Sequence, residues 1–183
     1  MPAIFVSHSS RDTNGIDFLR SHCTATGVRG HFYSWDGTAP PHGSTIKERI
    51  TQSDSLLVLL SPQLEDKHAS IAWVGFEVGV ANGLGKPVWV LERQMGQGHP
   101  DIVNVPVSGL TGYMERPGSL DTAQTEPYYS LVAQAGRGVP VHPKGGTIRR
   151  MTCPRDDCQS EYYEFHVGGM LYCPICRKRI NTE

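Results

Sequence analysis

The feature that most limits the possible folds is an unbroken apolar run at residues 55–60, which reads Ser-Leu-Leu-Val-Leu-Leu. A short run without polar alternation predicts a strand that is buried on both faces. Such strands are typical of the centre of a parallel sheet that is covered by helices on both sides. The run therefore favours an α/β fold.

Strand-like and helix-like segments alternate on both sides of this run. Besides residues 55–60, strands are predicted at residues 3–8, 31–35, 87–91 and 110–114, and helices at 15–25, 44–52, 70–83 and 121–135. The alternation predicts a five-stranded parallel sheet flanked by helices. Ligands of such sheets bind at the carboxyl ends of the strands. The segments expected there are residues 7–10, 35–43, 61–62 and the start of the helix at 70–83.

Four of the five cysteines lie in the last 31 residues, with the spacing C-x4-C-x14-C-x2-C. Paired cysteines on two tight turns are typical of tetrahedral zinc sites. We therefore predict one Zn²⁺ held by Cys153, Cys158, Cys173 and Cys176. Because four thiolates leave no open position for water or substrate, the predicted role of this metal is structural.

The segment between the two cysteine pairs suits a β-hairpin. Residues 162–167 and 170–172 are strand-like, Gly-Gly at 168–169 suits the turn, and the arrangement resembles a zinc ribbon. About 30 residues bury too little surface to fold alone, so the metal is expected to supply much of the folding free energy. Two disulfides or four inert thiols are the alternatives, and His166 is a competing ligand. The expected domains are residues 1–135, a Gly/Pro-rich linker at 136–148, and the ribbon at 149–183.

Glu77 is the candidate catalytic residue. It is the sole ionisable side chain between residues 69 and 85, in a segment that is apolar around the whole circumference of the predicted helix. A buried, unpaired carboxylate is costly and is usually retained for a partner or a function. Trp73 lies one turn earlier and projects from the same face. The alternative is a structural Glu77 that pairs with a lysine or arginine.

Composition and motifs exclude several classes of function. The net charge is −1, so no overall field attracts nucleic acid or an anionic membrane. The N-terminus has no basic leader and no run of 18 apolar residues occurs, which favours a cytoplasmic protein. Ser7 and His8 are adjacent and point to opposite faces of a strand, so a nucleophile–base pair is disfavoured. Gly83-Leu84-Gly85-Lys86 fails as a phosphate loop because it precedes a strand.

Taken together, these landmarks resemble a microbial TIR (Toll/interleukin-1 receptor) domain over residues 3–135. The residues that carry the resemblance are Phe5-Val6-Ser7-His8-Ser9-Ser10, Trp35-Asp36, Gly43, Leu57-Val58-Leu59-Leu60-Ser61-Pro62, Trp73-x-x-x-Glu77-Val78-Gly79-x-Ala81 and Gly85-Lys86-Pro87-Val88. The family fold is a five-stranded parallel sheet with helices on both faces, which agrees with the pattern described above.

The resemblance implies an enzyme that cleaves NAD between nicotinamide and ribose. Many microbial TIR domains use a glutamate at the position of Glu77, with an aromatic residue at that of Trp73. The substrate-binding residues implied are Phe5, Ser7, His8, Trp35, Asp36 and Trp73, with Phe5 and Trp35 as stacking surfaces. Residues 37–43 correspond to the loop that takes part in self-association in this family, and the implied context is microbial immune signalling.

Two other functions fit the same residues. One is a TIR adaptor that only binds other proteins, in which Glu77 has a structural role. The other is a related N-glycosidic enzyme that acts on a nucleoside or nucleotide with the same carboxylate. A nucleic-acid role for the ribbon is disfavoured because acidic residues nearly cancel its lysines and arginines.

Overall fold

A computed structural model gives the fold. It describes residues 1–33, 42–61, 64, 68–93, 110–116, 126–137, 148–153, 155–159 and 161–165. Within them, no helix is long and apolar enough to cross a membrane.

Strands and helices alternate through most of the chain, as the hydrophobic pattern predicts. The elements are β1 (Ala3–Ser7), α1 (Thr13–Thr26), β2 (Arg29–Phe32), α2 (Gly43–Thr51), β3 (Ser55–Leu60), α4 (His68–Gly83), β4 (Val88–Arg93), β5 (Leu110–Arg116), α5 (Glu126–Arg137), β6 (Ile148–Thr152) and β7 (Glu161–Phe165).

The sheet has seven strands in the order β2-β1-β3-β4-β5-β7-β6, so the predicted count of five is corrected. Strands β1 to β5 pair in parallel, and β7 adds in parallel to β5. The strand β6 is antiparallel to β7 and forms one edge. After β2 the chain crosses to the other side of β1, so the topological switch point lies between β1 and β3. In folds with this order, ligands bind at the switch point.

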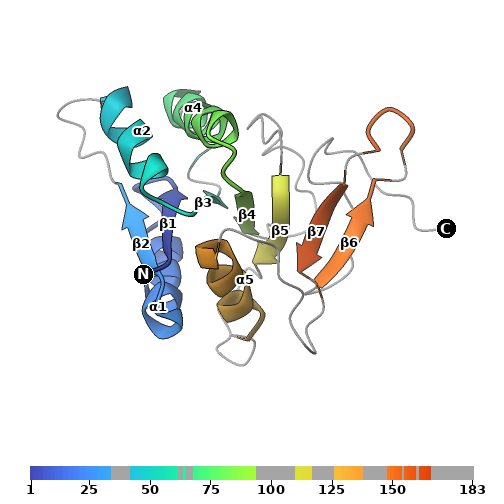
Figure 1. Ribbon diagram of the computed structural model, residues 1–183, viewed down its shortest axis with the longest axis horizontal. Helices are drawn as coiled ribbons and strands as arrows, with labels where there is room; N and C mark the ends of the chain where they lie inside the picture. The colour runs from blue at the N-terminus through green and yellow to red at the C-terminus, as the bar shows by residue number, and fades with distance from the viewer. Residues whose placement is uncertain are drawn as a thin grey trace.

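Two layers of helices cover the sheet, with α2 and α4 on one face and α1 and α5 on the other (Figure 1). Alternate residues of β1 divide between them, because successive strand side chains point to opposite faces. Phe5 joins the core under α2 and α4, whereas Ile4 and Val6 join the core under α1 and α5. The run Ser55–Leu60 is buried at all six positions, as a central strand requires.

The helix α5 extends into the segment predicted as a linker. It ends at Arg137, and its residue Gly136 packs against Val28. A Cβ at Gly136 would lie 2.6 Å from Val28 Cγ2, so the close approach of α5 to the residue before β2 needs glycine. Gly136 therefore packs with residues 1–135.

The predicted zinc-ribbon hairpin does not appear among the described residues. Its first strand overlaps β7, but β7 pairs with β6 and β5, and β6 was not expected. The turn at 168–169 and the strand at 170–172 lie outside the described residues. Figure 1 shows β6 and β7 continuing the main sheet beyond β5. The division into residues 1–135, 136–148 and 149–183 stays a prediction.

Candidate functional site

Buried polar atoms without hydrogen-bond partners gather at the carboxyl ends of β1 and β3. Ser7 is the last residue of β1 and Ser61 follows β3, and both side chains are 0% exposed. Among the described residues, the Oγ atoms of Ser7 and Ser61, both ring nitrogens of His8 and Oδ2 of Asp12 have no partner. Native proteins rarely leave buried polar atoms unpaired, because each one costs free energy. The switch-point edge of the sheet is therefore the candidate ligand site.

The segment after β1 folds back over this edge. The backbone N–H of Asp12 donates to the Ser9 carbonyl oxygen at 3.1 Å. Asp12 then caps α1, because its Oδ1 accepts from the Gly15 backbone N–H at 3.0 Å. Side chains that accept from the first-turn N–H groups are the usual start of a helix. The turn and cap hold His8, Ser9 and Ser10 at the rim of the sheet.

One face of α4 closes the other side of a cleft. Its residues in the cleft follow helical spacing, at positions i, i+3, i+4 and i+7. The cleft is lined by His8, Ser9, Ser10, Tyr33, Ser70, Trp73, Val74 and Glu77. Its volume is about 70 Å³, well below the roughly 300 Å³ at which small-molecule pockets begin. The cleft enclosed by the described residues is therefore too small to hold a whole drug-sized ligand.

Glu77 is the acidic group of the cleft. Its side chain is 9% exposed, and Val74, Val78 and Ala81 anchor the same helix in the core. Desolvation by burial raises the pKa of Glu77 from 4.5 to about 7. The nearby Ser7 hydroxyl lowers the pKa and so offsets part of this rise. Its contact with Glu77 does not meet the geometry of a full hydrogen bond, and Ser7 Oγ has no other partner. Near neutral pH, Glu77 is therefore close to half ionised.

His8 faces the cleft as a largely neutral imidazole. Burial lowers its pKa, the Ser9 backbone opposes this, and the charge of Arg20 lowers the pKa further. Its ring lies 6.0 Å from the Phe32 ring, tilted by 47°. A neutral imidazole offers one donor and one acceptor nitrogen, so His8 can hydrogen-bond a ligand hydroxyl.

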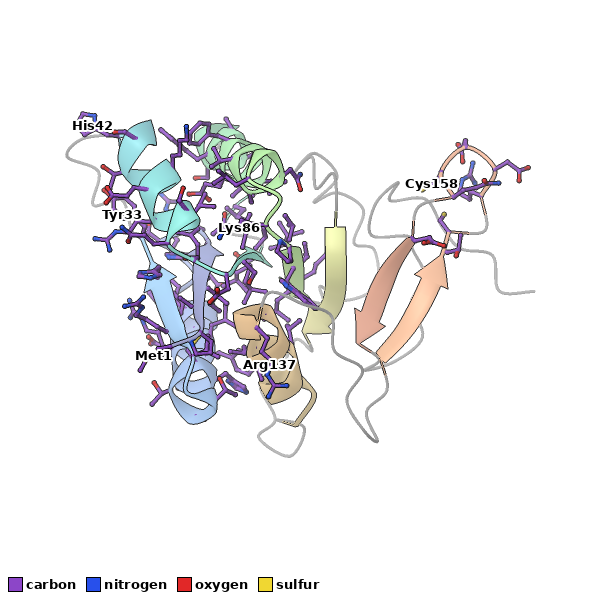
Figure 2. All side chains as sticks on the ribbon, viewed as in Figure 1. Met1, Tyr33, His42, Lys86, Arg137 and Cys158 are labelled. Carbon is purple, nitrogen blue, oxygen red and sulfur yellow. The ribbon has the colours of Figure 1, made fainter. Side chains whose placement is uncertain are left out.

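Tyr33 and Trp73 supply the aromatic surface of the cleft. Tyr33 is 39% exposed and follows β2 directly, beside α2 in Figure 2. Trp73 contacts Phe76 edge-on, with 5.5 Å between ring centroids. Two aromatic rings at one cleft can pack against a planar ligand ring. None of the described lining residues is a lysine or arginine, so the cleft suits a neutral or cationic group.

Three of the predicted site residues, His8, Trp73 and Glu77, meet in this cleft. Ser7 lies behind them at the Glu77 carboxylate. Phe5 is 0% exposed within the core and does not line the cleft, so it offers no surface for stacking. Trp35 and Asp36 lie outside the described residues.

Ser70 lies at the helix start that was expected at the ligand edge, whereas sequence reasoning missed Tyr33 and Val74 as cleft residues. The spacing of Val74 from Glu77 on one helix was the available signal. For Tyr33 there was little signal, because an aromatic residue at a strand end is equally typical of a core.

The predicted zinc ligands are described in part. Cys153 is 1% exposed and Cys158 is half-buried. Cys173 and Cys176 lie outside the described residues. Within the part of the chain that the structure describes, no three His, Cys, Asp or Glu side chains form a metal-binding group.

Comparisons with known proteins leave the family open. No protein family and no curated protein matches the chain. Among solved structures, a diflavin flavoprotein A3 from Nostoc sp. is similar, with 22% identity and a TM-score of 0.45. The match covers 74% of this chain and 89% of that one.

Proposed function

We propose that this protein is a TIR-type enzyme that cleaves NAD at the bond between nicotinamide and ribose. The observation that carries the proposal is the Glu77 carboxylate, which is buried beside Trp73 in a cleft at the switch point of the sheet. The proposed biological role is microbial immune signalling in the cytoplasm, with activity switched on by self-association.

The chemistry needs few groups. Nicotinamide is cationic while bonded to ribose, and it leaves with the bonding electron pair as a neutral base. No general acid is therefore required. The ribose carbon becomes oxocarbenium-like, as in glycoside hydrolysis. The ionised form of Glu77 stabilises that positive charge, and burial strengthens the interaction because little water screens it. Water then adds to the ribose carbon and loses a proton, or another nucleophile takes its place.

The other cleft residues have supporting roles in this proposal. Trp73 and Tyr33 pack against the planar nicotinamide and His8 hydrogen-bonds the ribose, whereas the buried Ser7 lies against the Glu77 carboxylate. The absence of lysine and arginine from the described lining fits a cationic ring. Trp35 and Asp36 are proposed to contact the remainder of the dinucleotide, which the described cleft is too small to hold.

A non-catalytic adaptor is the second candidate, and one observation favours it. Phe76 and Leu84 of the α4 region are exposed by 40% and 38%. Exposed apolar side chains are typical of protein-binding surfaces. Phe76 also contacts Trp73, so a partner that covers Phe76 would act directly on the cleft. The same contact fits an enzyme that is activated by association.

Nicotinamide release from NAD is the test of the proposal. The purified full-length protein is expected to release nicotinamide, with a rate per chain that rises with protein concentration because association activates it. An enzyme specific for other N-glycosides would instead cleave deoxynucleosides offered in parallel. If neither substrate is cleaved even at high protein concentration, the adaptor is favoured and the enzyme is excluded.

The pH dependence of this activity follows from Glu77. The ionised carboxylate is the active form, and its pKa in the free protein is about 7. We therefore expect kcat/KM to fall about tenfold per pH unit below pH 7 and to level off above it, because kcat/KM reports the free enzyme. Initial rates at NAD concentrations below KM measure this profile. A flat profile between pH 5.5 and 8 would contradict the role of Glu77.

A further inference from the structure

One face of α4 gives the cleft three side chains of different chemistry. Ser70, Trp73 and Glu77 all line the cleft and lie on successive turns of the helix. With a rise of about 1.5 Å per residue, Ser70 lies about 10 Å from Glu77 along the helix axis. The α4 wall of the cleft therefore has a carboxylate at one end, an aromatic ring in the middle and a hydroxyl group at the other end.

The Ser70 hydroxyl differs from those of the two other serines that line the cleft. Ser9 Oγ accepts from the Arg11 backbone N–H at 3.3 Å, so this hydroxyl already takes part in the turn after β1. Ser10 is exposed at the rim. Ser70 is half-buried and belongs to the same helix as Glu77. Because a serine hydroxyl can both donate and accept hydrogen bonds, Ser70 can bind either the oxygen or the nitrogen of a ligand amide.

The proposed reaction fixes one end of the substrate on this wall. The ribose lies against Glu77, and the nicotinamide ring extends from the ribose along Trp73. A carboxamide group on that ring can then point toward the start of α4, where Ser70 lines the cleft. Val74 also lines this wall, but its buried, apolar side chain offers an amide no hydrogen bond.

We propose that Ser70 is a specificity-determining residue, which hydrogen-bonds the carboxamide of the nicotinamide ring. This inference rests on the proposed function and adds the contact by which the cleft distinguishes nicotinamide from other pyridine rings. A ring without the amide keeps its packing against Trp73 and loses the hydrogen bond to Ser70. Sites that hydrogen-bond a substrate group select against analogues that lack the group, because the polar group of the protein is then left unpaired.

The test compares NAD with pyridine adenine dinucleotide, an analogue whose ring has no carboxamide. Ser70→Ala should lower kcat/KM for NAD by about three- to tenfold, the usual contribution of one neutral hydrogen bond. It should leave kcat/KM for the analogue within about twofold. The loss for NAD should appear in KM and not in kcat, because the amide contact is the same before and during bond cleavage. Comparing the ratio of the two substrates between proteins cancels their different intrinsic reactivity.

Ser21→Ala is the matched control for this experiment. Ser21 is an exposed serine within α1 and does not line the cleft, so its substitution should leave both substrates unaffected. An equal loss for NAD and the analogue in Ser70→Ala would show a structural role and overturn the proposal. If Ser10→Ala removes the preference for NAD and Ser70→Ala does not, the carboxamide lies at the opposite rim and the proposal also fails.

Binding of free nicotinamide separates this inference from the proposed function. The full-length wild type and Ser70→Ala are each titrated with nicotinamide and with pyridine, and binding is followed by ligand-observed NMR. The dissociation constant of nicotinamide should rise about three- to tenfold in Ser70→Ala, and that of pyridine should not change. A wild type that cleaves no NAD refutes the proposed function. A wild type that cleaves NAD but binds nicotinamide as Ser70→Ala does refutes only the role of Ser70.

Discussion

Glu77→Gln is expected to lower nicotinamide release from NAD by about a hundredfold or more, which is the usual loss when one preorganised electrostatic contact is removed. Glutamine keeps the size and shape of the side chain but cannot carry the negative charge that faces the developing oxocarbenium ion. The loss should appear in kcat, because the charge acts in the transition state rather than on bound substrate. Initial rates over a range of NAD concentrations separate kcat from KM.

The matched control for this experiment is Glu92→Gln. Glu92 is also 9% exposed, but it lies in β4 and does not line the cleft. Its substitution should leave nicotinamide release within about twofold of the wild type, since sites outside the cleft rarely change kcat directly. If Glu77→Gln retained wild-type activity, the assignment of Glu77 would be wrong. If both variants lost activity equally, the loss would reflect folding and not the reaction.

The same substitution is expected to stabilise the protein at alkaline pH. The pKa of Glu77 is raised from 4.5 to about 7 by burial, so ionisation is costly in the folded state. A shift of this size corresponds to about 3 kcal/mol. Above pH 7 the wild type carries the full cost, and Glu77→Gln does not. Sites kept for function commonly reduce stability in this way.

The direction of the pH dependence follows from proton binding. Below pH 4.5, Glu77 is protonated in both the folded and unfolded states and contributes nothing. Between pH 4.5 and 7 the folded state holds a proton that the unfolded state has released, so stability falls as the pH rises. We therefore expect the free energy of unfolding of Glu77→Gln, minus that of the wild type, to grow by about 3 kcal/mol between pH 4.5 and 8.

Urea unfolding at the two pH values measures this difference, with a common slope m fitted to both proteins. What is compared is the change with pH in the difference between the unfolding free energies of the two proteins. A pH-independent effect of replacing protonated glutamate by glutamine on stability therefore cancels. A difference that stays the same at both pH values would mean that Glu77 is solvated in the folded protein. In that case the water-poor cleft on which the proposed chemistry depends would not exist.

The local pattern of apolar and polar residues was sufficient to predict much of the fold. The six apolar residues of β3 predicted a central strand, and all six are buried. Glu77 was identified because no other ionisable side chain occurs in its apolar helix. The ends of β2 were less well predicted. Helix α1 ends at Thr26 and is capped by Gly27, whose φ of 67° favours glycine, and β2 begins at Arg29, two residues earlier than expected.

Other features depend on contacts between distant segments. The alternation of β1 places Phe5 and Ser7 on the same face but does not tell which of them lies against Glu77. Helices α2 and α4 cover Phe5 in the core, whereas Ser7 lies at the end of the strand beside Glu77. The strand β6 begins Ile-Arg-Arg, which has little strand character, and it forms because β7 offers a partner.

The sequence by itself determined the α/β class, the candidate carboxylate and the spacing of the four cysteines, because each of these is a local property of residue type and periodicity. The tertiary structure decided which residues share the cleft. Tyr33, His8 and Glu77 meet only because the order β2-β1-β3 places the switch point between β1 and β3. The tertiary structure also decided that the hairpin β6–β7 extends the main sheet. Strand pairing depends on which backbone edge is available, here that of β5, and not on the cysteine spacing.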